Sequence, residues 1–136
     1  MTKVIAVDFD GTLCENKYPE IGEPNWLVIF AAKAEQEKGA KLILWTCRAG
    51  KELAEAVEVA GCWGLTFDAI NENLPERIEQ YGNDPRKIGA DEYWDDRAVA
   101  LSDIPGIAFS ERFRNKLLYG VACTDAELEV MTHENP

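Results

Sequence analysis

Short apolar runs alternate along the chain with longer segments in which apolar residues recur at helical spacing. The short runs, rich in β-branched and aromatic residues, predict strands, and the longer segments predict helices. The strands are expected at 3–9, 41–47, 65–70 and 90–94, and the helices at 25–38, 51–60, 74–81 and 110–119. Asn25 is expected to cap the first helix and Gly39 to end it. Residues 14–24 contain two prolines and a glycine, which predicts a loop.

This order of elements predicts an α/β fold, a three-layer sandwich with a central parallel sheet and helices on both faces. Right-handed crossovers would place all the carboxyl ends of the strands along one edge, where open α/β sheets bind ligands. The chain has 136 residues, of which 46% are hydrophobic, and this suits one compact domain. We expect that domain over residues 1–124, followed by an acidic, flexible tail over 125–136.

Polar residues follow three of the four predicted strands. They are Asp-Phe-Asp-Gly-Thr-Leu at 8–13, Thr-Cys-Arg at 46–48 and Asp-Asp at 95–96, with Lys87 shortly before the last pair. Clustered carboxylates repel one another unless they share a cation or protons. The chain has one histidine and no Cys-x-x-Cys pair, so an oxygen-liganded Mg²⁺ is favoured over zinc.

Asp8 and Asp10 are spaced for joint action on one ligand. Residues two apart on an extended strand point to the same side, and Gly11 allows a sharp turn directly after them. One carboxylate can then attack phosphorus while the other handles the proton of the leaving group. An aspartyl-phosphate divides the very slow hydrolysis of a phosphate monoester into two easier steps.

With these motifs in order, the chain resembles the haloacid dehalogenase (HAD) superfamily of phosphohydrolases in its small, minimally capped form. DFDGTL at 8–13 is similar to the first family motif and LILWTCR at 42–48 to the second. Lys87 is the candidate third motif, and EYWDD at 92–96 is similar to the fourth. Dehalogenases of the superfamily lack the second aspartate, so Asp10 favours phosphate chemistry.

The resemblance implies a role for each motif. Asp8 would be the nucleophile, and Asp10 the general acid for the leaving group and then the base for water. The Asp8 carboxylate, the Asp10 backbone carbonyl and the Asp95 carboxylate would hold Mg²⁺, supported by Asp96. Thr46 would hydrogen-bond a phosphoryl oxygen and Lys87 would neutralise its charge. The full set of candidate substrate-binding residues is Gly11, Thr12, Thr46, Cys47, Arg48 and Lys87.

Some of these assignments have alternatives. Lys87 lies only eight positions before Asp95, nearer than in many relatives, so Arg86 or Lys51 could supply the cation instead. Arg48 could pair with a carboxylate rather than with phosphate. No large cap is expected, because 14–24 is short and 71–86 has room for a short helix. The site would then be open, or covered by a neighbouring subunit of a homo-oligomer.

The leading hypothesis is a phosphatase acting on a small phosphorylated metabolite or nucleotide. A receiver-like phospho-acceptor also joins Asp, Thr and Lys at strand ends, but there the acidic pair follows the first strand. A catalytically idle HAD scaffold that serves as a binding module is the third hypothesis. The net charge of −11 argues against long nucleic acid as a partner. We expect a cytoplasmic protein with reduced cysteines and no membrane partner, because no signal segment or spanning apolar stretch is present.

Overall fold

A computed structural model describes residues 2–104 of the chain. It has two compact units, residues 1–96 and residues 97–136. Of the second unit the described part is 97–104, which includes a short 3₁₀ helix, η1 (Leu101–Asp103). The helix expected at 110–119 and the tail expected at 125–136 lie outside the described residues. The candidate site lies wholly in the first unit.

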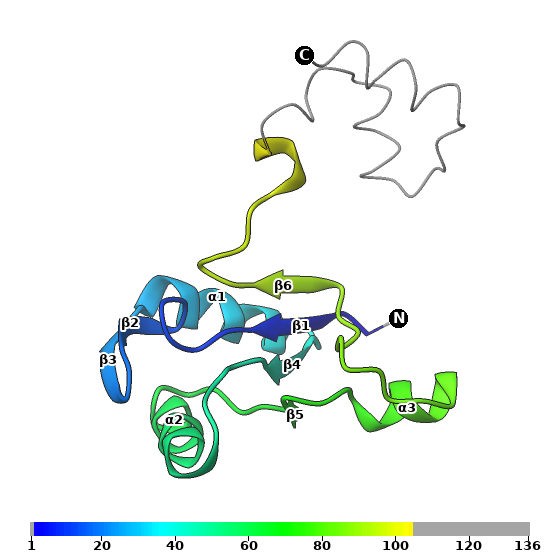
Figure 1. Ribbon diagram of the computed structural model, residues 1–136, viewed down its shortest axis with the longest axis horizontal. Coiled ribbons are helices and arrows are strands. Elements are labelled where there is room, and N and C mark those ends of the chain that lie inside the picture. Colours follow the sequence, from blue (N-terminus) through cyan, green and yellow to red (C-terminus); the bar gives the residue numbers. More distant parts are fainter. Residues whose placement is uncertain (1, 105–136) are drawn as a thin grey trace. The chain divides into compact units, whose positions relative to one another are not determined.

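The first unit is built on a four-stranded, parallel sheet (Figure 1). Its strands are β1 (Val4–Val7), β4 (Lys41–Leu44), β5 (Ala69–Ile70) and β6 (Glu92–Trp94). Their order across the sheet is β5-β4-β1-β6. The predicted α/β class with a parallel central sheet is therefore confirmed.

The order of the strands changes direction at β1. From β1 the chain runs to β4 and β5 on one side, and it later returns to β6 on the other side of β1. Val7, the last residue of β1, is in register with Leu44 on one side and Trp94 on the other. Open α/β sheets bind ligands beyond the carboxyl ends of their strands at such a reversal. The residues that follow β1 and β6 are therefore the first to examine.

Helices and connecting segments cover both faces of this sheet. Alternate residues of a strand point to opposite faces, so Ile5 and Val7 share one buried cluster while Val4 and Ala6 belong to another. The first cluster includes residues of α1 (Trp26–Glu37) and α2 (Gly50–Cys62). The second includes Leu74 and Ile88, which flank α3 (Pro75–Tyr81) in the sequence. These packed faces fix the position of β1 and of the residues after it.

Residues 14–24 form an antiparallel hairpin, so the expectation of a loop was wrong. The hairpin consists of β2 (Cys14–Lys17) and β3 (Glu20–Pro24). Gly22 permits the close approach of its strands, because a Cβ atom there would lie 2.0 Å from the carbonyl oxygen of Glu15. Glycine therefore serves close strand pairing here rather than a turn. Figure 1 shows the hairpin beyond the carboxyl end of β1.

Two other expectations differ from the structure. The third strand covers only Ala69–Ile70, because Leu65 is buried against the end of α2 and Asp68 Oδ2 accepts a hydrogen bond from the backbone N–H of Leu42 at 2.9 Å. Asn25 does stand at the N-cap position of α1, but its side chain donates to the carbonyl of Thr12 at 3.3 Å instead of accepting from the helix. Asn25 thus links α1 to the segment that follows β1.

Two further features concern membrane-spanning helices and the cysteine side chains. Among residues 2–104, no helix has both the length and the apolar character needed to span a bilayer. Cys14, Cys47 and Cys62 are free thiols; Cys14 is buried, whereas the other two are exposed. Cys123 lies outside the described residues. Of the three described cysteines, only Cys14 fills a core position.

Candidate functional site

Asp8 is held beside the end of β6 by its own backbone. Its N–H donates to the carbonyl of Trp94 at 2.9 Å, which continues the pairing of β1 with β6 by one residue. Trp94 is the last residue of β6, so Asp95 follows at once. Residues that are far apart in the sequence, 8 and 95, therefore meet at the reversal of strand order. This is the juxtaposition expected from the carboxyl ends of parallel strands meeting along one edge of the sheet.

Asp8, Asp95 and Asp96 form a carboxylate cluster. One oxygen from each lies within 4.8 Å of the others. Asp8 is half-buried, and Asp95 and Asp96 are exposed. An all-oxygen, all-anionic set of this kind suits Mg²⁺, which takes one or two protein carboxylates and keeps several waters. The donors present therefore fit a magnesium ion.

Burial and neighbouring acidic groups raise the pKa of Asp8 from 3.8 to about 6. Burial of the carboxyl group is the largest cause, and the negative charge of Asp95 is the second. A hydrogen bond from Thr12 and one from the backbone of Phe9 act in the opposite direction. Like charges that cannot escape to solvent favour protonation unless a cation is present. The electrostatics of Asp8 thus agree with a site built to receive positive charge.

The turn after β1 is organised by Thr12. Its Oγ1 donates to Asp8 Oδ2 at 3.2 Å and accepts from the N–H of Asp96 at 3.0 Å. The side chain is buried, with 7% of Thr12 exposed. Thr12 therefore ties the nucleophile candidate to the acidic pair, which gives this predicted substrate-binding residue a clear structural task.

Gly11 lies directly against the carboxylate cluster. Its φ is +90°, and a Cβ atom built on it would lie 2.3 Å from Asp96 Oδ2. Both facts exclude any other residue without a shift of Asp96 or of the backbone. The glycine of the first motif is thus explained by close approach as well as by the turn.

The Asp10 carboxylate forms an ion pair with Arg48. Arg48 Nε donates to Asp10 Oδ2 and Arg48 Nη2 donates to Asp10 Oδ1, both at 2.7 Å. The side chains are 1% and 15% exposed for Arg48 and Asp10. A paired fork of this kind is the strongest form of arginine–carboxylate contact. The Asp10 side chain is therefore held in one orientation at the edge of the site.

The other N–H groups of Arg48 also donate to protein acceptors. Nη1 contacts the carbonyls of Pro19 at 3.1 Å and Glu52 at 3.3 Å, and Nη2 contacts the carbonyl of Glu20 at 2.9 Å. A guanidinium has five N–H donors, and in this structure each has an acceptor. Of the two roles considered for Arg48, the geometry favours pairing with a carboxylate over contact with a phosphate.

Thr46 and Cys47 follow the neighbouring strand, β4. The N–H of Thr46 donates to Asn71 Oδ1 at 2.8 Å, and its Oγ1 accepts from the N–H of Arg48 at 3.1 Å. Cys47 is exposed. Asn71, which has a positive φ of 54°, was not anticipated from the sequence as a support for this segment. Its Asn side chain directly after a short strand was the available signal, because Asn tolerates that conformation.

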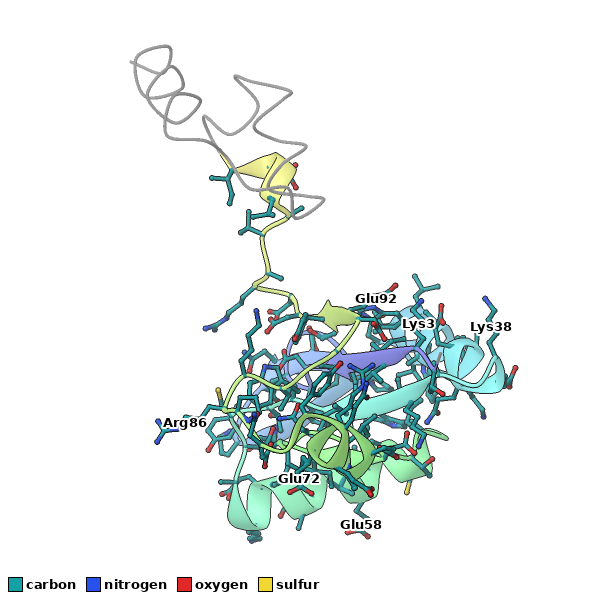
Figure 2. The ribbon with its side chains drawn as sticks, turned by 90° about the vertical axis from the view of Figure 1, so that its right-hand side faces the viewer. Lys3, Lys38, Glu58, Glu72, Arg86 and Glu92 are labelled. Atoms are coloured by element: carbon teal, nitrogen blue, oxygen red, sulfur yellow. The ribbon has the colours of Figure 1, made fainter. Side chains whose placement is uncertain are left out.

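The three candidate cations occupy different places. Lys87 is exposed in the segment between α3 and β6, with Nζ 5.8 Å from the ring centroid of Tyr93. Lys51 lies in the first turn of α2, where its Nζ is 3.9 Å from Glu55 Oε1. Figure 2 shows Arg86 extending outward from the body of the unit. Lys87 belongs to the segment that leads into β6 and its acidic pair, and its role as the phosphate-binding cation stays a prediction.

The comparisons with known proteins identify a relative without assigning an activity. No protein-family model and no curated protein matches the chain. A solved structure, described as that of a conserved protein from Bacteroides thetaiotaomicron, is 37% identical. The match covers 94% of this chain and 98% of the other, with a TM-score of 0.65. The chain therefore belongs to the same family as this conserved Bacteroides protein.

Proposed function

We propose that the protein is a magnesium-dependent phosphomonoester hydrolase of the HAD type, working through an aspartyl-phosphate on Asp8. The observation that carries the proposal is the meeting of Asp8 with Asp95 and Asp96 at the reversal of strand order. In this proposal the sheet and its helices are a Rossmann-like HAD core. The raised pKa of Asp8 supports it, because burial and the charge of Asp95 disfavour the Asp8 anion, and a bound cation would stabilise it.

The carboxylates of Asp8 and Asp95, the backbone carbonyl of Asp10 and the nearby Asp96 would hold the ion. When bound, Mg²⁺ would shield the anionic nucleophile from the anionic phosphate and stabilise charge on the phosphoryl oxygens. Thr12 keeps Asp8 and Asp96 in a fixed relation through its two hydrogen bonds. The ligand set is thus preorganised by the chain itself, before any ligand arrives.

Asp8 would attack the phosphorus atom, forming an Oδ–P bond as the bond from phosphorus to the leaving oxygen breaks. Asp10 would give that oxygen a proton. Water would then attack the same phosphorus, giving its proton to Asp10 and releasing Asp8 and inorganic phosphate. Thr46 and Lys87 would contact the phosphoryl oxygens. Asp10 returns to its initial protonation state, so the cycle closes.

The substrate would be a small phosphorylated metabolite or a nucleotide, handled by a cytoplasmic protein. In this proposal the hairpin of β2 and β3 takes the place where larger relatives insert a cap. Its strands have only four and five residues, too few for a separate domain. The site would therefore be open, or closed by a second copy of the chain in a homo-oligomer.

Phosphate release from p-nitrophenyl phosphate and from a panel of phosphorylated metabolites, with and without Mg²⁺, tests the proposal. The wild type should turn over many times with Mg²⁺ and stop when a chelator is added. Asp8→Asn should abolish turnover, whereas Glu58→Gln, at an exposed position of α2, should leave it unchanged.

Two outcomes would point to the other hypotheses. A receiver-like domain would take up about one phosphoryl group per chain from a small phosphodonor without repeated turnover. An idle scaffold would show neither uptake nor release on any member of the panel. Full activity of Asp8→Asn would refute the assignment of the nucleophile.

A further inference from the structure

Arg48 connects three separate parts of the first unit. Its guanidinium holds the carboxylate of Asp10, the carbonyls of Pro19 and Glu20, and the carbonyl of Glu52. Pro19 precedes and Glu20 begins β3, and Glu52 lies in the first turn of α2. One buried side chain therefore joins the proposed acid–base residue to the hairpin and to a helix of the core.

Two aromatic rings enclose this guanidinium. The Arg48 Cζ lies 5.1 Å from the ring centroid of Phe9 and 5.1 Å from that of Tyr18. Phe9, which stands between Asp8 and Asp10 in the sequence, is fully buried. Tyr18, in the hairpin turn, is 58% exposed. An arginine held by a bidentate carboxylate, carbonyls and ring faces has a single favourable orientation. Its rigidity passes to Asp10, since both carboxylate oxygens are fixed by it.

We infer that Arg48 is a positioning residue that sets the orientation of Asp10 and makes that orientation depend on the hairpin of β2 and β3. This inference rests on the proposed function and adds a residue role to it. A lysine at position 48 would keep one positive charge but lose the fork, and its three N–H donors are too few for the five acceptors that Arg48 holds. Asp10 and the hairpin would then loosen together.

A burst experiment with Arg48→Lys separates positioning from general damage. With p-nitrophenyl phosphate the first step needs little help from Asp10, because p-nitrophenolate leaves as an anion without prior protonation. The second step needs Asp10 to take a proton from water. The variant should release about one equivalent of nitrophenol per site quickly, and then turn over roughly 100-fold more slowly than the wild type, which is a typical value of one acid–base group.

Arg77→Lys is the matched control, because Arg77 makes a longer ion pair with Asp91, at 3.8 Å, outside the site. It should keep wild-type turnover without a burst. If Arg48→Lys lowers the burst and the steady rate by one common factor, or raises turnover, the positioning role is refuted. If the wild type itself releases no phosphate, the proposed function fails instead, and the two failures are therefore distinct.

Hydrogen exchange of the hairpin amides gives a readout that does not need activity. Both Arg48→Lys and Asp10→Asn should speed exchange in Cys14–Lys17 and Glu20–Pro24 by a similar factor, roughly 10-fold or more, and the double variant should add little to either. Exchange that remains at wild-type rates in both single variants would show that the hairpin does not depend on this pair, and would overturn the inference.

Discussion

Replacing Gly11 with alanine tests the carboxylate cluster against a control that the chain itself provides. Gly11 and Gly39 have similar positive φ angles, +90° and +98°. At Gly11 a Cβ atom would lie 2.3 Å from Asp96 Oδ2, whereas at Gly39 nothing lies within 4 Å. Both alanine variants therefore place an L-residue at a similar positive φ, and only one disturbs the proposed metal ligands.

The expected magnitudes follow from these contacts. Backbone strain of an L-residue at positive φ costs about 1–2 kcal/mol of folding free energy in each variant. In Gly11→Ala the Asp96 carboxylate must also move by about 1 Å to reach ordinary contact, while its N–H stays bound to Thr12. Because a side chain can rotate away, the added cost to stability is small. The added cost to Mg²⁺ binding is roughly 10–100-fold in affinity, as for other residues that orient metal ligands.

Calorimetric titration and thermal unfolding with and without Mg²⁺ measure both effects. At a Mg²⁺ concentration of 100 times the wild-type Kd, the ion stabilises the fold by about 2.7 kcal/mol. The same concentration should stabilise Gly11→Ala by about 0.4–1.4 kcal/mol, and Gly39→Ala by the full wild-type amount. If Gly11→Ala bound Mg²⁺ as tightly as Gly39→Ala, the reasoning about Asp96 would be refuted.

Three further predictions concern the same cluster. Because the pKa of Asp8 is about 6, Mg²⁺ must displace a proton at lower pH, so its affinity should fall about tenfold from pH 7 to pH 5 in calorimetry; a flat profile would contradict this. Because folding raises the pKa of Asp8, protonation of its carboxyl group favours the folded state. This contribution to stability is complete below pH 3.8, and it is lost as the pH rises through 6. In metal-free protein at pH 7.5, Asp8→Asn should therefore raise the free energy of unfolding by about 1 kcal/mol, after a discount for solvent screening, and should gain nothing at pH 3.5 in chemical denaturation. Thr12→Val removes the hydroxyl that joins Asp8 to Asp96 and should lower that free energy by about 1–3 kcal/mol, whereas Thr12→Ser should retain most of it.

The sequence predicted the elements whose side chains repeat with a clear period. The predicted helix at 25–38 is observed at Trp26–Glu37, and the one at 74–81 at Pro75–Tyr81. The predicted third strand, 65–70, is longer than the observed strand, Ala69–Ile70. The segment LTFDAI is one apolar run, but Leu65 packs in the core and the Asp68 side chain accepts a hydrogen bond from the backbone of Leu42. Apolar character alone does not distinguish a strand from a buried connection.

The hairpin and the partner of Asp10 were beyond the reach of the sequence pattern. Proline and glycine usually indicate loops, but Gly22 lies in a strand, where the backbone carbonyl of Glu15 leaves no room for a Cβ atom. The meeting of Asp8 with the pair at 95–96 followed from strand order, which chain topology restricts strongly. The Arg48–Asp10 pair depends on side-chain directions and on the position of the hairpin, and neither can be derived from the spacing of residues in the sequence.

Borohydride trapping gives the most direct test of the central claim, that Asp8 accepts phosphorus. The full chain would be mixed with p-nitrophenyl phosphate and Mg²⁺, quenched during turnover and reduced, so that an aspartyl-phosphate becomes homoserine. Peptide mass spectrometry should find homoserine at position 8, and none when substrate or Mg²⁺ is left out. Ongoing phosphate release with residue 8 still aspartate, or with homoserine at another position, would contradict the account.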